Sequence, residues 1–163
     1  MELVYIGKIV NTHGIKGELR LLSKFPYKDK VFKEGKIIYI NKDNHEVINS
    51  YRRHKNFDMI TLKGYNNIND VLKYKGKNAY INKDDIILDD NKYLDEDLIG
   101  LDVFYEDRNK GIVKDIERYD KMSLFVIKGT EKEYLIPYND NLIDKIDISN
   151  NKLYIKDIKG LFD

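Results

Sequence analysis

Short runs of β-branched, aliphatic and aromatic residues recur along the whole chain, separated by turn-forming residues every few positions. Such runs are typical of β-strands, and several begin as a polar/apolar alternation that indicates a half-buried strand. In the first half we expect strands at residues 3–10, 18–22, 36–41, 46–54, 58–62 and 78–82. In the second half we expect short antiparallel strands at residues 101–105, 111–119, 122–128, 133–137, 145–148 and 152–155.

Residues 68–74 depart from this pattern. Asn and Asp side chains that can cap a helix lie at its start, apolar residues lie at positions 68, 71 and 72, and Gly76 follows. Polar caps at the beginning and a glycine after the end are helix signals. We therefore expect one short helix here, and a polar connection without a central strand over residues 23–36, which contain Pro26.

Many short strands with regular turns favour barrels, in which a closed sheet leaves no free edge. The 163 residues suffice for one ordinary domain or two small ones. A stretch rich in Asp, Asn and Lys, residues 83–96, interrupts the β pattern and has the character of a linker. The predicted fold is mainly β, with two small β-barrels at residues 1–88 and 97–163 joined by a short linker at residues 89–96.

Composition excludes several classes of protein. The chain has no cysteine, which excludes disulfides and thiolate metal sites. Its first residues show no secretory signal, and its longest apolar runs, such as residues 37–40, are far shorter than the roughly 20 residues of a membrane helix. We expect a soluble cytoplasmic protein, a monomer with no membrane partner.

The net charge of +1 conceals an asymmetry between the two halves. Residues 1–88 contain 17 Lys and Arg against 10 Asp and Glu, whereas residues 89–163 contain 12 against 18. A basic half suits nucleic acid and an acidic half suits a basic protein. Alternatively, the two halves attract each other.

The loop between the first two predicted strands carries two glycines three positions apart, together with His13 and Lys16. Glycine permits positive φ angles and close backbone approach, so this loop can hold donors and positive charge at a hairpin tip. The simpler interpretation is a bulged turn whose polar residues face water.

A second basic stretch, residues 51–57, alternates cationic groups with aromatic rings. Arginine binds phosphate through two hydrogen bonds and stacks on bases, as rings do. With the first loop it predicts one nucleic-acid-binding face, although solvated charges at a strand end explain the stretch equally well. The residues that we assign to this face are His13, Lys16, Arg20, Arg52, Arg53, His54 and Lys55.

Catalytic signals are weak. The histidines lack metal-ligand spacing, and no nucleophile or dinucleotide motif is present, so we expect no catalytic residue, metal or cofactor. Asp95, Asp97, Gly100 and Glu106 match four positions of a calcium loop, but Ile99 occupies a ligand position. The Asp clusters leave one alternative function open, a metal-dependent RNA-processing enzyme. A regulatory module of a membrane complex is a third possibility, weakened by the lack of a membrane segment.

The order and spacing of several motifs resemble the RimM family of bacterial ribosome maturation factors, which process 16S rRNA. The resemblance covers nearly the whole chain. It rests on residues 7–10 and 13–18, on Phe25-Pro26, and on residues 52–55, 97–100, 135–138, 146–148 and 160–162.

This resemblance implies a RimM N-terminal barrel followed by a PRC-barrel. It implies a non-enzymatic factor that binds the immature 30S subunit at its head, contacting ribosomal protein nineteen of the small subunit and helping 16S rRNA mature. We expect Tyr93, Leu94 and Asp97 to contact the ribosomal protein. The family usually has two tyrosines and a tryptophan at residues 93–95, where this chain has only the first tyrosine and then Leu94 and Asp95.

Overall fold

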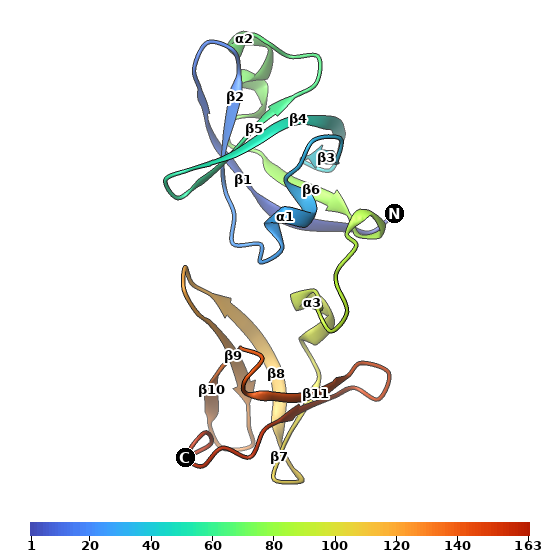
Figure 1. Ribbon diagram of the computed structural model, residues 1–163, viewed down its shortest axis with the longest axis vertical. Coiled ribbons are helices and arrows are strands. Elements are labelled where there is room, and N and C mark those ends of the chain that lie inside the picture. The colour runs from blue at the N-terminus through green and yellow to red at the C-terminus, as the bar shows by residue number, and fades with distance from the viewer. The chain divides into compact units, whose positions relative to one another are not determined.

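The computed structural model describes residues 1–163, which form two compact units, Met1–Leu88 and Asp89–Asp163. Both are built on a six-stranded sheet, which confirms the mainly β fold (Figure 1). The segment 89–96, expected as a linker, belongs to the second unit by its contacts. The limits of independently folding domains stay a prediction.

The first unit is a closed barrel in which the strands follow the order β1-β2-β5-β4-β3-β6. Its strands are β1 (Leu3–His13), β2 (Glu18–Leu22), β3 (Ile37–Ile40), β4 (Asn44–His54), β5 (Phe57–Leu62) and β6 (Asn78–Asn82). Its helical turns are α1 (Lys28–Val31), α2 (Ile68–Val71), η1 (Leu72–Tyr74) and η2 (Lys83–Asp85).

Alternation along the strands fills the barrel. In β2, Leu19 and Leu21 are fully buried whereas Glu18 and Arg20 are half-exposed on the other face. This is the pattern predicted for residues 18–22, and it arises because successive side chains of a strand point to opposite faces. Inward-facing residues of all six strands complete the core, among them Ile9, Ile38, Ile48, Ile60 and Ile81.

The predicted helix at residues 68–74 is confirmed as α2 followed by the 3₁₀ turn η1. The Asn67 side chain accepts a hydrogen bond from the Asn69 backbone N–H at 2.9 Å, as a cap does. The unpredicted turn α1 lies in the connection at residues 23–36. Its four residues are too few for a periodic signal, and it buries one side chain, Val31.

The second unit is a six-stranded sheet with the order β10-β9-β8-β7-β12-β11. Its elements are α3 (Asp95–Leu98), β7 (Asp102–Tyr105), β8 (Arg108–Arg118), β9 (Ser123–Lys128), β10 (Glu133–Pro137), β11 (Ile143–Asp147) and β12 (Lys152–Ile155). We expected only antiparallel strands, but β12 runs parallel to β7. The β11–β12 hairpin adds to the sheet through its second strand, whose direction is that of β7.

The core of the second unit gathers aromatic residues. Phe125 is fully buried, and its ring stacks on Tyr138 with centroids 4.3 Å apart. Phe162, near the end of the chain, contacts the rings of Tyr105 and Tyr134 at 4.7 and 5.0 Å. Such pairs add to the free energy gained from burial, so the last residues take part in this core.

Candidate nucleic-acid interface

Two hairpins of the first unit carry the basic residues that the sequence singled out, and strand pairing brings the hairpins together. The β1–β2 hairpin and the β4–β5 hairpin are joined by the pairing of β2 with β5, in which Arg20 lies opposite Met59. Met59 lies in turn opposite Arg52. Arg20 and Arg52 therefore share one row across the sheet, although 32 positions separate them in the sequence.

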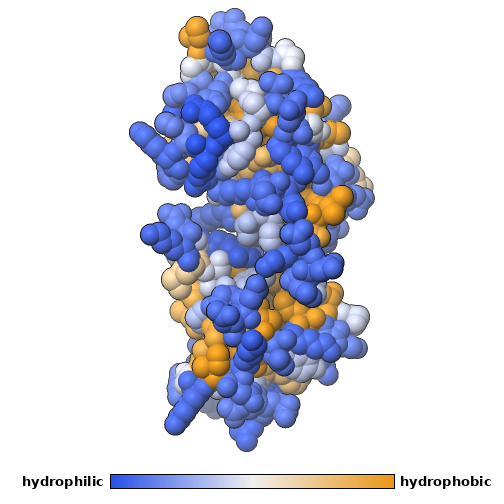
Figure 2. All heavy atoms as spheres, in the orientation of Figure 1, coloured by the Kyte–Doolittle hydropathy of each residue, from blue (hydrophilic) through white to orange (hydrophobic).

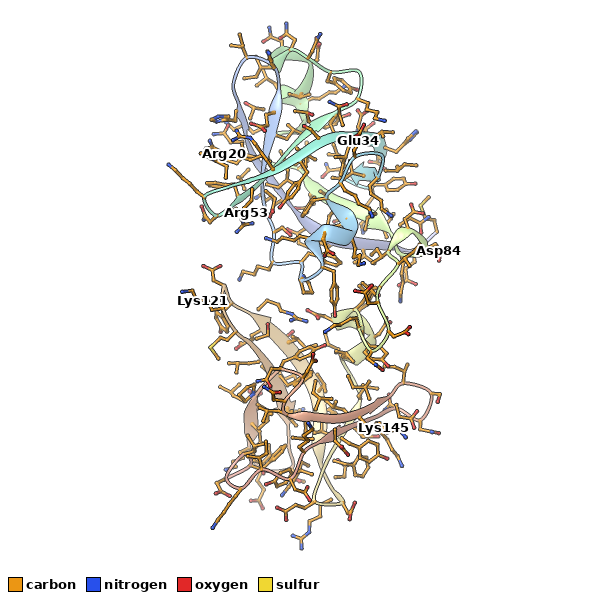
Figure 3. All side chains as sticks on the ribbon, viewed as in Figure 1. Arg20, Glu34, Arg53, Asp84, Lys121 and Lys145 are labelled. Atoms are coloured by element: carbon orange, nitrogen blue, oxygen red, sulfur yellow. The ribbon has the colours of Figure 1, made fainter.

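The row belongs to the outer face of the barrel, because Leu19 and Leu21 on either side of Arg20 are buried. The same alternation places Glu18, His13 and His54 on this face. We call the outward residues His13, Glu18, Arg20, Arg52, His54 and Phe57 the outer-face cluster. Figure 2 shows strongly hydrophilic residues gathered where the β4–β5 hairpin of Figure 1 projects, and Figure 3 labels Arg20 beside it.

Arg20 is held by two contacts. Its Nη2 donates a hydrogen bond to Nδ1 of His13 at 2.8 Å, and its Cζ lies 4.9 Å from the centroid of the Phe57 ring. Its Nε is buried and has no hydrogen-bond partner. The ring of His54 lies 6.1 Å from that of His13. Phe57, Arg20, His13 and His54 thus form a chain of neighbouring planar groups.

Arg52 and Glu18 form an ion pair on this layer. Nε and Nη2 of Arg52 donate to the two carboxylate oxygens of Glu18 at 2.8 and 2.7 Å. These hydrogen bonds lower the pKa of Glu18 and raise that of Arg52. Sequence reasoning missed Glu18, although a carboxylate two positions before Arg20 in a predicted strand is a visible signal of same-face pairing.

The pKa of His54 is lowered from its usual value by partial burial and by the positive charges of Arg52, Lys55 and Arg20. Loss of solvent and nearby like charge both disfavour the protonated imidazole. Arg20 lies in β2 and Arg52 in β4, so cations from two different strands lie near His54.

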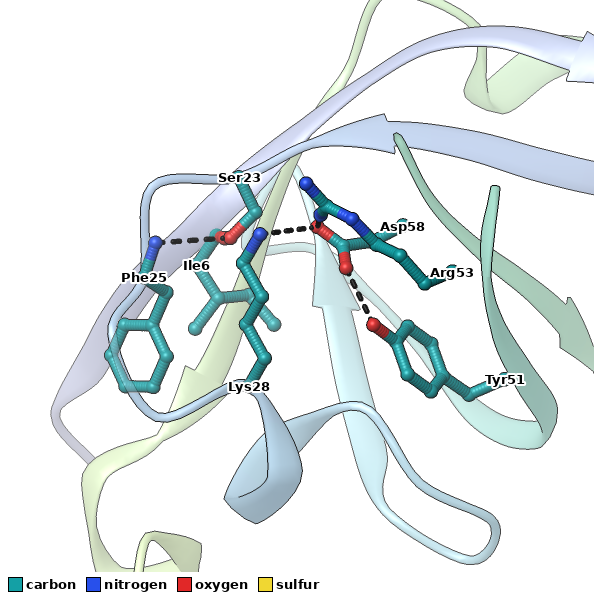
Figure 4. A network of polar contacts seen from close by, with 7 residues as sticks. All are labelled: Ile6, Ser23, Phe25, Lys28, Tyr51, Arg53 and Asp58. Carbon is teal, nitrogen blue, oxygen red and sulfur yellow. Dashed lines mark hydrogen bonds and ion pairs between the residues drawn. The ribbon is translucent and has the colours of Figure 1, made fainter. Parts of the chain in front are cut away.

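Arg53 does not share this face. Its neighbour in the chain, Arg52, points outward, so Arg53 points to the other side of the strand and donates to Asp58 at 2.9 Å (Figures 3 and 4). Asp58 is fully buried and also contacts Nζ of Lys28 at 2.9 Å and the hydroxyl of Tyr51 at 2.6 Å. Desolvation and the bond to Asp58 raise the pKa of Tyr51 to about 12. The predicted run of residues 52–55 is thus divided between an outward cluster and a structural ion network.

Lys16 and Lys55 lie at the tips of the two hairpins, and both are exposed. The tip of the β1–β2 hairpin is held by α2, because the carbonyl of Ile15 accepts a hydrogen bond from the Ile68 N–H at 2.9 Å. Gly17 has a φ of +87°, and a Cβ there would lie 3.1 Å from the Asn67 carbonyl oxygen. Only glycine fits this position without strain, so α2 holds the tip in place.

The residues predicted to contact a ribosomal protein lie in the second unit. Leu94, at the start of α3, is only 5% exposed, which leaves little of its side chain for a partner. Tyr93 packs partly against the core of the unit. Asp95, which stands where the family usually has tryptophan, binds Arg118 through two hydrogen bonds at 3.1 and 2.5 Å.

The acidic residues considered for metal binding are dispersed. No group of three or more His, Cys, Asp or Glu side chains is arranged to hold a metal ion. Of the calcium-loop candidates, Asp95 and Asp97 lie in the helical turn α3 and Glu106 follows the strand β7. The continuous loop that the motif requires is absent.

The two units also match known protein families. Residues 4–86 match the model of the RimM N-terminal domain, and residues 95–161 match the model of the RimM PRC barrel domain. These matches define a two-domain ribosome maturation factor. The chain belongs to the RimM family, as the resemblance in its sequence indicated, and its role is in ribosome maturation.

Relatives named ribosome maturation factor RimM support this assignment over the full length. The protein of Staphylococcus haemolyticus strain JCSC1435 is 43% identical, covering 98% of this chain and 99% of the relative. That of Staphylococcus aureus strain RF122 is 39% identical with the same coverage.

Two solved structures are also similar. A crystal structure of a Pseudomonas aeruginosa protein described as a 16S ribosomal RNA processing protein RimM is 21% identical, with a TM-score of 0.46, and covers 95% of this chain and 97% of that one. The solution structure of the N-terminal domain of Thermus thermophilus RimM is 20% identical, with a TM-score of 0.48, and covers 54% and 98%. No helix in the structure has the length and apolar character needed to cross a membrane.

Proposed function

We propose that the chain binds the precursor of the 30S subunit at its head and promotes maturation of 16S rRNA by binding, without catalysis. The observation that carries the proposal is the row of outward arginines, Arg20 and Arg52, flanked by exposed Lys16 and Lys55. Arginine and lysine groups that face water on one side of a fold suit the phosphates of rRNA. His13 and His54 belong to the same surface, whereas Arg53 supports it through Asp58.

For the second unit we propose contact with ribosomal protein nineteen of the small subunit. The excess of acidic over basic residues in 89–163, 18 against 12, suits a basic protein partner. Tyr93 and Asp97 are the candidates for this contact. Leu94 is buried in the free protein, so it would contribute only if binding exposed its side chain. The protein would act as a cytoplasmic monomer that favours a productive conformation of the head by binding it better than the alternatives.

Co-sedimentation of the full chain with immature 30S particles, mature 30S particles and naked 16S rRNA tests this function. We expect selective binding to the immature particles. Equal binding to naked rRNA would reduce the protein to a general RNA binder, and no binding to any of the three would refute the proposal. Incubation with precursor rRNA and Mg²⁺ in the same buffer tests the alternative, because cleavage by the purified protein would identify an enzyme.

A further inference from the structure

The outer-face cluster consists of more than positive charge. Four of its half-exposed members are planar and neighbour one another in the order Phe57, Arg20, His13, His54. Binding to the phosphates of a duplex needs only cations at the right spacing. A contiguous planar layer is instead the chemistry that stacks on nucleobases.

The guanidinium of Arg20 is available to a ligand, because the neighbouring carboxylate, that of Glu18, is already bound to Arg52. Glu18 accepts both hydrogen bonds of Arg52, so Arg20 lacks an acidic partner and rests instead against the Phe57 ring. A guanidinium supported on one side by a ring can stack a base on its other side.

His13 is oriented by the same contact. A guanidinium has only donors, so Nδ1 of His13 must accept the hydrogen bond from Arg20 at 2.8 Å. The neutral imidazole then carries its proton on Nε2. His13 therefore presents a donor beside the layer, where it can reach an acceptor atom of a base or a phosphate.

We propose that the outer-face cluster binds unpaired nucleotides of RNA, with bases stacked on the layer of Arg20, Phe57 and His54 and phosphates held by Arg52 and Lys55. This rests on the proposed function and specifies its ligand: a single-stranded loop or bulge, in preference to a duplex. In a helix the base faces are covered by neighbouring pairs, so a planar layer gains nothing from it.

Fluorescence anisotropy with the full chain tests this. The probes are a labelled single-stranded RNA of 12 nucleotides and a labelled RNA duplex with the same number of phosphates, at one fixed salt concentration. Arg20→Lys keeps the charge but removes the planar group, and Phe57→Leu keeps an apolar side chain but removes the ring. The control is Arg108→Lys, on an exposed residue of the second unit.

We expect the unchanged chain to prefer the single strand. Arg20→Lys and Phe57→Leu should each weaken single-strand binding about fivefold or more, the scale of one lost stacking contact, and leave duplex binding within about twofold. Arg108→Lys should change neither affinity. Circular dichroism identifies variants that fail to fold, and His54→Gln provides a second test of the layer if Phe57→Leu is one of them.

The inference would be overturned if the unchanged chain bound both probes with equal affinity. It would also be overturned if Arg20→Lys bound the single strand as tightly as the unchanged chain does. The failure of this inference is distinguishable from failure of the proposed function. If immature 30S particles are bound but the planar variants bind them as well as the unchanged chain does, only the inference is wrong. If no particle is bound, the proposed function is wrong whatever the oligonucleotides show.

Discussion

The two units have the same number of strands but treat the edges of their sheets differently. In the first unit β1 pairs with both β2 and β6, so the ring is closed and every strand has two neighbours. In the second unit the order ends at β10 and β11, which carry charged residues and, in β10, Pro137. Charge and proline on an edge strand discourage pairing with another chain.

Their electrostatics differ as well. The closed barrel presents two basic hairpins on its outer face, whereas acidic residues predominate in the second unit. In the first, a buried carboxylate, Asp58, ties three elements together; in the second, aromatic pairs around Phe125 and Phe162 fill the core. A chain that divides charge in this way is suited to two chemically different partners at once.

The largest effect is expected from Gly111→Ala in the second unit. Gly111 has a φ of +137°, and a Cβ there would lie 2.1 Å from the carbonyl oxygen of Lys128 on the paired strand. Strand β8 must move away from β9, which we expect to lower the free energy of unfolding by roughly 3 kcal/mol or more. Chemical denaturation monitored by circular dichroism measures this.

Gly100→Ala is the control. Gly100 has a φ of +95°, but a Cβ there would meet open space, so the free energy of unfolding should fall by only about 1 kcal/mol. Equal effects of both substitutions would contradict the crowding at Gly111.

Asp58→Ala should have the next largest effect, and in the first unit. The substitution removes a fully buried carboxylate and leaves Lys28, Arg53 and the Tyr51 hydroxyl without it. Because Lys28 and Arg53 are partly exposed and can turn to water, we expect a loss of about 2 kcal/mol in the free energy of unfolding. Asp43→Ala, on an exposed turn, should change it by less than about 0.5 kcal/mol. A melting curve for Asp58→Ala that overlays that of the unchanged chain would show the network to be dispensable.

The two substitutions that break the Arg52–Glu18 pair, one at each residue, should change the affinity for immature 30S particles in opposite directions. Arg52→Ala removes a phosphate contact and frees a carboxylate on the same face, so affinity for immature 30S particles should fall and the salt dependence should flatten by about one unit of slope. Glu18→Gln keeps the size of the side chain, removes the negative charge and frees Arg52, so affinity should rise. Salt titrations of both variants measure this. If both weaken binding equally, the pair serves only to hold the fold.

The smallest effect concerns pH. Because the pKa of His54 is lowered in the free protein, the folded state disfavours its protonation, and the stability of the first unit should decline slightly as pH falls through and below about 6.5. A bound phosphate would place negative charge beside His54, which favours the protonated imidazole and raises the pKa of His54 in the complex. Affinity for single-stranded RNA should therefore increase, by less than about tenfold, between pH 8 and pH 6. His54→Gln should flatten this profile, and an unchanged slope in that variant would exclude His54 from the site.

Much of the fold could be predicted from local patterns. Strands 78–82, 133–137 and 152–155 agree with the structure at both ends, and the helix before Gly76 was visible from its caps. The turns α1 and α3 were missed because four residues leave no periodic signal. The parallel pairing of β12 with β7 was missed because direction of pairing depends on contacts between residues about 50 positions apart, which no local pattern reports.

The candidate site was predicted in composition but not in geometry. The basic stretch over residues 52–55 was found, yet the alternation of a strand separates Arg52 and His54 from Arg53, a consequence of the period of two. Pairing of β2 with β5 then brings Arg20 beside Arg52, which depends on a register that the sequence does not specify. The residue type of Leu94 does not tell whether its side chain is buried in its own unit, as the structure shows, or exposed to a partner.

Hydrogen exchange measured by mass spectrometry on the full chain, with and without immature 30S particles, tests the central claim most directly. The outer face of the first unit is predicted to contact rRNA, so binding should slow exchange in peptides covering residues 11–20 and 51–57. Protection in residues 89–163 would add a protein contact to this. Protection confined to residues 89–163, with the two basic hairpins exchanging as in the free protein, would contradict the assignment of rRNA binding to the first unit.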